Sequence, residues 1–142
     1  MTGCVATAMA MILKYHNFPV KGKGTHSYKT SSGLECSFDY GSTTFSWNEM
    51  RSQYVGGNYT TEEANAVAEL MHACGVAVDM EYSPSSSGAY SFKVGQALID
   101  YFGYDENLGY VCRQYFTSEE WINMIKTELS ERRPVLYNGA SK

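Results

Sequence analysis

The sequence predicts a mostly helical α+β domain, and three features support this fold class. An uncharged run from Cys4 to Leu13 has apolar residues at helical spacing, which is typical of a buried helix. Two capping boxes, Thr60–Glu63 and Thr117–Glu120, each precede a stretch with a helical apolar pattern. Residues 25–47 contain short alternating pieces rich in Ser, Thr and aromatic residues, which favour strands.

Length, composition and charge predict one globular domain, or part of one. The 142 residues are 44% hydrophobic and 14% aromatic, which is enough to build a core. The net charge of −4 offers no basic surface, so we expect no nucleic-acid partner. The apolar run after Cys4 is far shorter than the roughly 20 residues that cross a bilayer, and no basic region precedes it as in a signal peptide. We therefore expect no membrane partner and no targeting segment here.

The first predicted helix, which has Cys4 in its first turn, is expected to lie in the middle of the core. One face carries apolar residues at helical spacing and the opposite face is also apolar, which is typical of a helix buried on all sides. The residues of the first face are Val5, Ala8, Met9, Ile12, Leu13 and His16. Phe18-Pro19 ends the helix, because a proline disfavours helical backbone at the residue before it.

Cys4 is the one reactive side chain of this helix and lies in its first turn. The unpaired N–H groups and the positive dipole end at a helix N-terminus favour a thiolate. A thiolate on a rigid support at the edge of a cleft is suited to nucleophilic catalysis. The alternative is an inert core cysteine, which is the commoner role for this residue near a helix start.

Residues 25–47 are expected to form short strands or extended loops joined by turns, with Trp47 as a core anchor. The three extended pieces are His26–Lys29, Cys36–Tyr40 and Thr43–Trp47. The helix that begins at the first capping box is expected to end at Gly75, since glycine is a common C-terminal cap. Its predicted buried face consists of Ala64, Val67, Ala68, Met71 and Cys74.

The second half of the chain predicts extended chain at residues 76–82 and then a small-residue stretch, 83–89, that by itself indicates a plain linker. Residues 91–102 predict a helix ended by Gly103, with inward side chains at Val94, Ala97, Leu98 and Tyr101. A strand-like piece, 110–113, precedes the helix of the second capping box. The inward residues of that helix are Trp121, Ile122, Ile125 and Leu129, and a buried strand is expected at residues 134–137.

The four cysteines lack the spacing of a metal site, so we expect neither a metal nor a cofactor. Disulfides among Cys36, Cys74 and Cys112 stay open, because the sequence does not pair them. Cys74 falls on an apolar helix face and is expected to be a buried free thiol.

The order of motifs along the chain resembles the streptopain-type cysteine peptidases of family C10, which have a papain-like fold. Gly3–Ala8 and Lys14–Asn17 are similar to the helix that carries the active-site cysteine in that family. Further similar motifs follow in the same order: Glu69–Met71, Gly75-Val76, Val78–Met80, Tyr82, Pro84–Ser86, Phe102–Tyr104, Trp121, Glu128–Ser130, Pro134-Val135, Tyr137 and Gly139. The resemblance therefore covers nearly all of the 142 residues.

The resemblance implies a cysteine endopeptidase in which Cys4 is the catalytic nucleophile and forms a thioester acyl-enzyme with peptide or protein substrates. It places the side chain of Asn138 near the oxyanion, with a turn-forming Asn-Gly as the alternative role of Asn138. The backbone N–H of Cys4 is the other expected oxyanion donor, because the helix start leaves it free. It also implies that Ser86 and Gly88 face the substrate and that Ala140 lies beside the S2 pocket. The predicted fold is thus papain-like α+β, mostly its helical half, with a central buried helix that carries the nucleophile.

A thiol peptidase also needs a histidine beside its sulfur. His16 lies twelve residues beyond the cysteine, about 18 Å along the helix axis, and the sequence does not place His26 or His72 beside it either. In the family, the histidine follows the segment similar to residues 135–139. We therefore expect residues 1–142 to be one incomplete papain-like domain, with the histidine in a missing segment or on a second chain. The family also implies secretion and a propeptide or inhibitor as a partner.

Two other classes of function stay open from the sequence. A papain-like amidase or transferase would use the same thioester chemistry on a different acyl group. A non-catalytic binding module would keep the fold without the reaction. Cleavage of casein separates a peptidase from a transferase, and a histidine motif in the missing sequence excludes the non-catalytic class.

Overall fold

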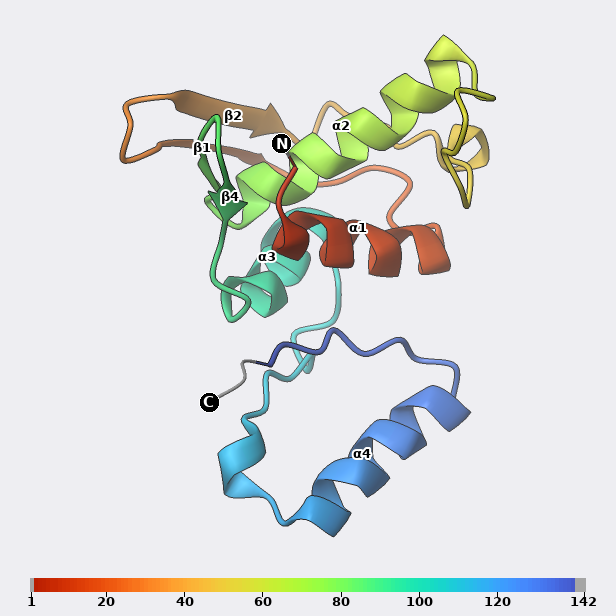
Figure 1. The fold of residues 1–142 in the computed structure, drawn as a ribbon, viewed down its shortest axis with the longest axis vertical. Helices are drawn as coiled ribbons and strands as arrows, with labels where there is room; N and C mark the ends of the chain where they lie inside the picture. The colour runs from red at the N-terminus through yellow and green to blue at the C-terminus, as the bar shows by residue number, and fades with distance from the viewer. Residues whose placement is uncertain (1, 140–142) are drawn as a thin grey trace.

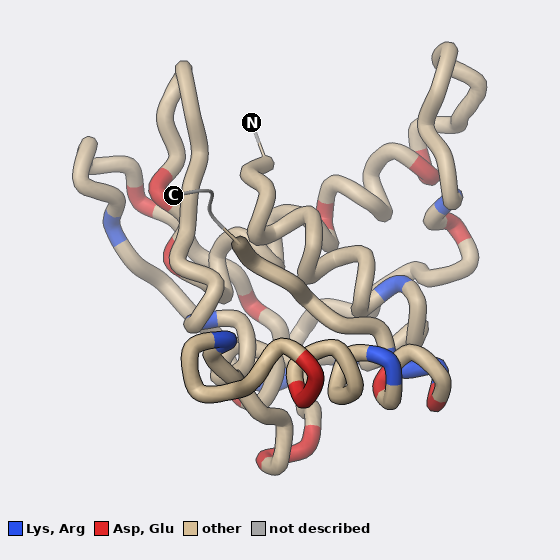
Figure 2. Tube along the Cα trace, turned by 60° about the horizontal axis from the view of Figure 1, so that its bottom comes forward, with Lys and Arg blue, Asp and Glu red and all other residues tan. Residues whose placement is uncertain are grey.

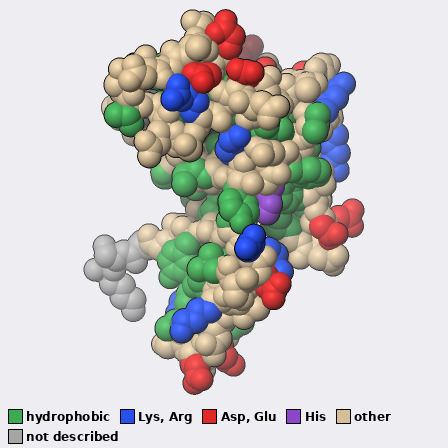
Figure 3. Space-filling view, turned by 90° about the vertical axis from the view of Figure 1, so that its right-hand side faces the viewer, with side chains coloured by type: hydrophobic (Ala, Val, Ile, Leu, Met, Phe, Trp, Pro, Cys, Tyr) green, Lys and Arg blue, Asp and Glu red, His purple; other side chains and the backbone are tan. Residues whose placement is uncertain are grey.

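The computed structural model describes residues 2–139, which form a body and an arm (Figure 1). The body contains the helices α1 (Cys4–His16), α2 (Thr61–Ala77) and α3 (Lys93–Phe102), together with two small antiparallel hairpins. The arm, residues 105–139, contains α4 (Ser118–Ser130). Hydrophobic side chains gather where the arm meets the body (Figure 3). No helix among residues 2–139 is both long enough and apolar enough to cross a membrane.

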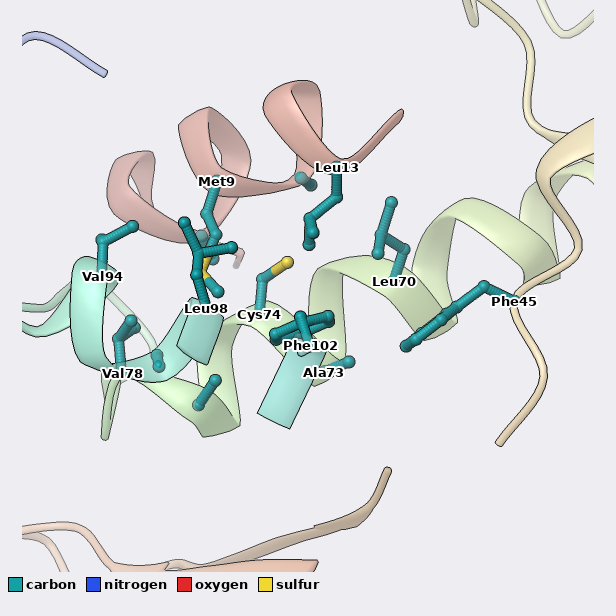
Figure 4. Close-up of a cluster of buried hydrophobic side chains, with 14 of the residues drawn as sticks. Met9, Leu13, Phe45, Leu70, Ala73, Cys74, Val78, Val94, Leu98 and Phe102 are labelled. Carbon is teal, nitrogen blue, oxygen red and sulfur yellow. The ribbon is translucent and has the colours of Figure 1, made fainter. Parts of the chain in front are cut away.

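The hydrophobic core lies between α1, α2 and α3 (Figure 4). Each helix contributes an apolar stripe, because every third or fourth residue falls on the same helix face. The side chains that meet there include Met9, Leu13, Leu70, Ala73, Cys74, Leu98 and Phe102. Leu108 and Leu136 of the arm pack against this core from outside.

α1 forms where the helix is predicted but is buried on one face only. Its buried residues are Val5, Ala6, Met9, Ala10 and Leu13, whereas Met11 is 68% exposed. Of the predicted face, Ala8 and Ile12 are half-buried and His16 is exposed. The prediction of a helix buried on all sides is therefore wrong for the described residues, because an apolar face becomes buried only where another element packs on it. The helix ends at Asn17, whose φ of 47° is a usual C-terminal geometry.

Two of the three extended pieces predicted in residues 25–47 are strands. β1 (Thr25–Lys29) pairs antiparallel with β2 (Glu35–Asp39). The third piece leads instead into a short 3₁₀ helix, η1 (Trp47–Glu49). Trp47 is buried, and its indole N–H donates to the carbonyl of Pro19 at 2.8 Å, which confirms its role as a core anchor.

α2 begins at the predicted capping box. The Thr60 hydroxyl accepts from the Glu63 N–H at 3.2 Å, and the Glu63 carboxylate accepts from the Thr60 N–H at 2.8 Å. The predicted end at Gly75 is wrong, because the helix continues to Ala77. Gly75 serves close packing instead, since a Cβ at this position would overlap the hydroxyl of Tyr82. The buried face also differs and shares only Cys74 with the prediction; it consists of Ala66, Leu70, Ala73, Cys74, Gly75, Val76 and Ala77.

A second hairpin replaces the extended chain and linker predicted for residues 76–89. Asp79 has left-handed backbone with φ 50°, and β3 (Glu81–Tyr82) then pairs antiparallel with β4 (Ser87–Gly88). α3 follows and ends at Gly103, with φ 68°, as predicted. Its buried residues are Val94, Ala97, Leu98 and Phe102, while Tyr101 is half-buried.

The arm departs most from the prediction. α4 begins at the predicted capping box, but none of its residues is fully buried, and Ile122 and Leu129 are 49% and 57% exposed. Residues 110–113 form no strand and lead into a 3₁₀ helix, η2 (Arg113–Tyr115). The buried strand predicted at residues 134–137 is also absent from the described residues. A strand needs a hydrogen-bonded neighbour, and within residues 2–139 no backbone hydrogen bond joins this segment to another.

Candidate active site

Cys4 is the first residue of α1, and it is exposed. The preceding residue, Gly3, has φ 79° and ψ 146°, a backbone conformation that is nearly confined to glycine. A Cβ at position 3 would lie 2.7 Å from the Sδ of Met80 and 3.1 Å from the carbonyl oxygen of Ser87. The residue before the cysteine therefore packs directly against the β3–β4 hairpin.

The first turn of α1 has no side-chain cap within the described residues, in contrast to the capping boxes of α2 and α4. Gly3 occupies the capping position and has no side chain that could accept from the N–H groups. The Thr7 hydroxyl instead donates to the carbonyl of Gly3 at 2.9 Å, so the side-chain hydrogen bond in this turn uses a backbone carbonyl and no N–H group. An uncapped helix start offers its N–H groups, including that of Cys4, to an anionic oxygen.

The β3–β4 hairpin lines an open groove of about 680 Å³. Ser86 and Gly88, the two residues predicted to face the substrate, both line this groove. The other lining residues are Tyr28, Lys29, Asp79, Glu81, Ala89, Tyr90 and Lys93. Cys4 is not part of the lining, but the carbonyl of Ser87, between the two predicted residues, lies against Gly3. The structure therefore brings Ser86 and Gly88 together and places them beside the cysteine helix.

Asp79, at the base of this hairpin, is hydrogen-bonded to two basic side chains. Its Oδ1 lies 2.7 Å from the Nε2 of His26, and its Oδ2 lies 2.7 Å from the Nζ of Lys93. Partial burial alone would raise the pKa of Asp79, but the hydrogen bonds and charges of Lys93 and His26 together lower it. The ring of His26 also lies against the rings of Tyr28 and Tyr101.

The three histidines, His16, His26 and His72, contact residues other than Cys4. His16 is at the far end of α1, and its ring makes a T-shaped contact with the ring of Tyr104. His26 is in strand β1, one of the two forms expected for its segment, and is bound to Asp79. His72 is exposed on α2. Within the described residues, no imidazole contacts the cysteine sulfur.

Asn138, the side chain predicted near the oxyanion, is exposed and makes no hydrogen bond within residues 2–139. Its segment, 134–139, runs back along α1 in the opposite direction, so that its end lies toward the Cys4 end of the helix (Figures 1 and 2). The role of Asn138 at the oxyanion thus stays a prediction. Ala140, predicted beside the S2 pocket, lies outside the described residues.

The other three cysteines are also free thiols. Cys36 and Cys74 are buried and Cys112 is half-buried. Burial raises the pKa of the Cys74 thiol far above its usual range, which confirms the predicted buried free thiol and makes it unreactive. Among the described residues, Cys4 is the one exposed cysteine.

Sequence reasoning missed the Asp79 network. Its members come from three distant parts of the chain, and residues 76–82 are expected to be extended rather than to contain a turn. One signal was present: an Asp just beyond a helix is among the few non-glycine residues that adopt left-handed backbone readily. That signal indicates a turn at Asp79, but it does not identify His26 and Lys93 as partners.

Comparison with known proteins gives consistent matches. The model of the Peptidase C10 family matches residues 1–142. Streptopain from Streptococcus pyogenes serotype M28 (strain MGAS6180) is 38% identical over 149 residues, which cover 99% of this chain and 37% of streptopain. The thiol protease/hemagglutinin PrtT from Porphyromonas gingivalis is 35% identical over 98% of this chain and 16% of its own length. The chain therefore spans well under half of each of these relatives.

Two solved structures are similar over most of the chain. The active wild-type interpain A cysteine protease of Prevotella intermedia has a TM-score of 0.86 and 43% identity, over 93% of this chain and 55% of that chain. A fragment of prointerpain A from the same organism has a TM-score of 0.85 and 43% identity, over 92% of this chain and 43% of that one. These likenesses confirm the predicted papain-like α+β fold.

Proposed function

Because the chain belongs to the peptidase C10 family, we propose that it is the cysteine-bearing part of a cysteine endopeptidase whose nucleophile is Cys4. The observation that carries this proposal is the position of Cys4, exposed at the first residue of an uncapped helix and beside a groove-lining hairpin. The similar proteins are named as a thiol protease and a cysteine protease. Since the chain spans 37% of streptopain, the proposed activity is that of the whole protein.

The proposed reaction begins with attack of the Cys4 thiolate on the carbonyl carbon of a peptide bond. A bond forms between sulfur and carbon, and the negative charge moves to the carbonyl oxygen. The backbone N–H of Cys4 donates to this oxyanion, because the helix start leaves it without an intrahelical acceptor, and Asn138 is the proposed second donor. The carbon–nitrogen bond then breaks as the amine takes a proton from an imidazolium. Water hydrolyses the resulting thioester and regenerates the thiol.

The histidine of this reaction is proposed to come from a further segment or from a second chain. The positions of the three histidines in residues 2–139 support this. The length of α1 separates His16 from Cys4, and His26 is held by Asp79. His72 is on α2, and its ring makes a T-shaped contact with the ring of Phe38.

The proposed substrates are peptides and proteins that bind along Ser86 and Gly88, with Ala140 beside the S2 pocket. A propeptide is proposed as a partner, which the existence of a prointerpain A form of the relative supports. Export from a bacterial cell is proposed from the family resemblance, and its test is the protein's presence in culture medium.

Casein cleavage by the full gene product that carries these residues tests the proposal. The wild type should release peptides, Cys4→Ala should release none, and Cys112→Ala should match the wild type. The Cys112 variant is the matched control, because it removes another accessible thiol without touching the helix start. Undiminished cleavage by the Cys4→Ala variant would refute the assigned nucleophile. A folded wild type that releases no peptide would favour the non-catalytic or transferase class.

A further inference from the structure

The β3–β4 hairpin is too small to hold its own position. It contains two residue pairs, Glu81–Gly88 and Tyr82–Ser87. A two-stranded hairpin is marginal in water even when it is longer. The Ser83 hydroxyl closes the turn, since it donates to the carbonyl of Ser86 at 2.6 Å and accepts the N–H of Ser86 at 3.0 Å. These bonds fix the shape of the turn, so contacts from outside must fix where the hairpin lies.

The first hairpin, β1–β2, supplies contacts to three successive residues at the start of the second one. The pairs are His26–Asp79, Tyr28–Met80 and Ser31–Glu81. The Tyr28 hydroxyl donates to the Met80 carbonyl at 2.6 Å. His26 and Tyr28 are two residues apart in β1, so their side chains lie on the same face of the strand. The outgoing strand of the hairpin is therefore attached along one side.

The returning strand is attached through Lys93, the first residue of α3. Its ammonium lies 2.7 Å from the Oδ2 of Asp79, while the Oδ1 is bound to His26. Asp79 precedes segment 80–92 and Lys93 follows it. The Asp79 carboxylate thus joins the two ends of this segment to each other and to His26 in strand β1. Each carboxylate oxygen of Asp79 therefore has one basic partner within the protein.

We propose that Asp79 is a positioning residue for substrate binding, whose carboxylate holds the two ends of segment 80–92 together and so keeps Ser86 and Gly88 at the groove. This inference rests on the proposed function, because these two residues contact a substrate only if the protein is a peptidase. The separate contacts of Met80 with Tyr28 and Gly3 do not involve the carboxylate. Loss of the carboxylate charge therefore affects substrate binding more than it affects the position of the helix that carries Cys4.

Two pairs of variants isolate this role. Asp79→Asn keeps the size of the side chain and the tolerance for left-handed backbone but removes the charge. Asp100→Asn makes the same chemical change at an exposed position of α3, where the carboxylate accepts from Gln96 at 2.8 Å. Lys93→Gln removes the cation of the ion pair, and Lys93→Arg retains it.

Three measurements on the full gene product follow: KM and kcat for a peptide substrate, the rate of Cys4 alkylation by iodoacetamide, and amide hydrogen exchange. Asp79→Asn and Lys93→Gln should each raise KM about tenfold, with kcat and the alkylation rate within about twofold of the wild type. Exchange should accelerate in residues 80–92 and not in α1. Asp100→Asn should behave as the wild type does, and Lys93→Arg should restore most of what Lys93→Gln loses.

Unchanged KM and unchanged exchange in Asp79→Asn would overturn the inference. Equal losses in kcat and in the alkylation rate would overturn it too, because the carboxylate would then support Cys4 rather than the groove. A wild type that is alkylated at Cys4 but cleaves no peptide would contradict the proposed function and the substrate role of Asp79 together. In that case faster exchange confined to residues 80–92 would show that the carboxylate still holds the hairpin.

Discussion

The sulfur of Met80 lies so close to Gly3 that a Cβ added to the glycine would be 2.7 Å from it. Met80 follows Asp79 at the start of the β3–β4 hairpin, and Gly3 precedes the cysteine of α1. The hairpin that lines the groove and the helix that carries Cys4, the proposed nucleophile, therefore meet at a backbone position without a side chain. Close packing of this kind fixes the position of one element relative to the other.

Gly3→Ala should disturb this contact. The backbone at position 3 is nearly confined to glycine, and the methyl group would also displace Met80, so we expect a loss of about 1–3 kcal/mol in the free energy of unfolding. Casein cleavage should fall as well. The matched control is Gly57→Ala, at φ 73° with open space around it, which adds backbone strain without a clash. Equal stability and activity in the two variants would mean that the Gly3–Met80 contact is unimportant.

Gly75→Ala tests why a glycine lies inside α2. Alanine is the better helix former by about 1 kcal/mol, so the substitution would stabilise an exposed helix. Here we expect destabilisation, because the methyl group meets the hydroxyl of Tyr82. Tyr82→Phe removes that oxygen and should restore much of the loss in a double-mutant cycle measured by urea unfolding. Additive effects of the two substitutions would contradict the proposed packing role.

The two capping boxes should contribute to different parts of the molecule. Thr60→Ala and Thr117→Ala each remove one cap, which typically costs about 1 kcal/mol. α2 is part of the core, so Thr60→Ala should lower the global free energy of unfolding. None of the residues of α4 is fully buried, so Thr117→Ala should mainly accelerate amide exchange within the arm. Faster exchange throughout the body in Thr117→Ala would show that arm and body unfold together.

Asp79 should make the protein sensitive to acid. Its pKa in the folded state is lowered, whereas an unfolded aspartate has a pKa of about 3.9. The stabilisation by its carboxylate is therefore fully present above about pH 4 and is lost as the pH falls through the lower folded pKa. Urea unfolding from pH 5 downward should show a shallower loss for Asp79→Asn, and Asp100→Asn should follow the wild type. The difference should be small, because solvent screens a side chain that is 36% exposed. Parallel curves for all three proteins would contradict this prediction.

Local features of the fold could be predicted from the sequence. The place of α1 before Pro19, both capping boxes and the end of α3 at Gly103 follow from residues that act on their immediate neighbours. Features that depend on residues distant in the sequence could not be predicted. In the sequence, Gly75 is equally consistent with a helix end and with a site of close packing, and only the position of Tyr82 decides between the two. Residues 134–137 have the composition of a strand, but a strand also requires a neighbour with which to pair.

The residues of the candidate site also differ in whether the sequence alone could predict them. Cys4 could be identified from its place in the first turn and from the family motif around it, because both are local in the sequence. Ser86 and Gly88 came from the family resemblance, since their composition alone indicated a linker. The Asp79 network required the fold, because Asp79 and His26 are 53 residues apart in the chain. Alternation in β1 indicates which residues share a face, but not which element they meet.

The identity of the nucleophile is tested by the intact mass of the full gene product after treatment with E-64, an epoxide inhibitor of cysteine peptidases. We expect one covalent adduct that maps to Cys4, is prevented by prior iodoacetamide treatment and is absent from the Cys4→Ala variant. Buried Cys36 and Cys74 should stay unmodified in the folded protein. A folded protein without an adduct, or an adduct that maps to another cysteine, would contradict the assignment of Cys4 as the nucleophile of a cysteine peptidase.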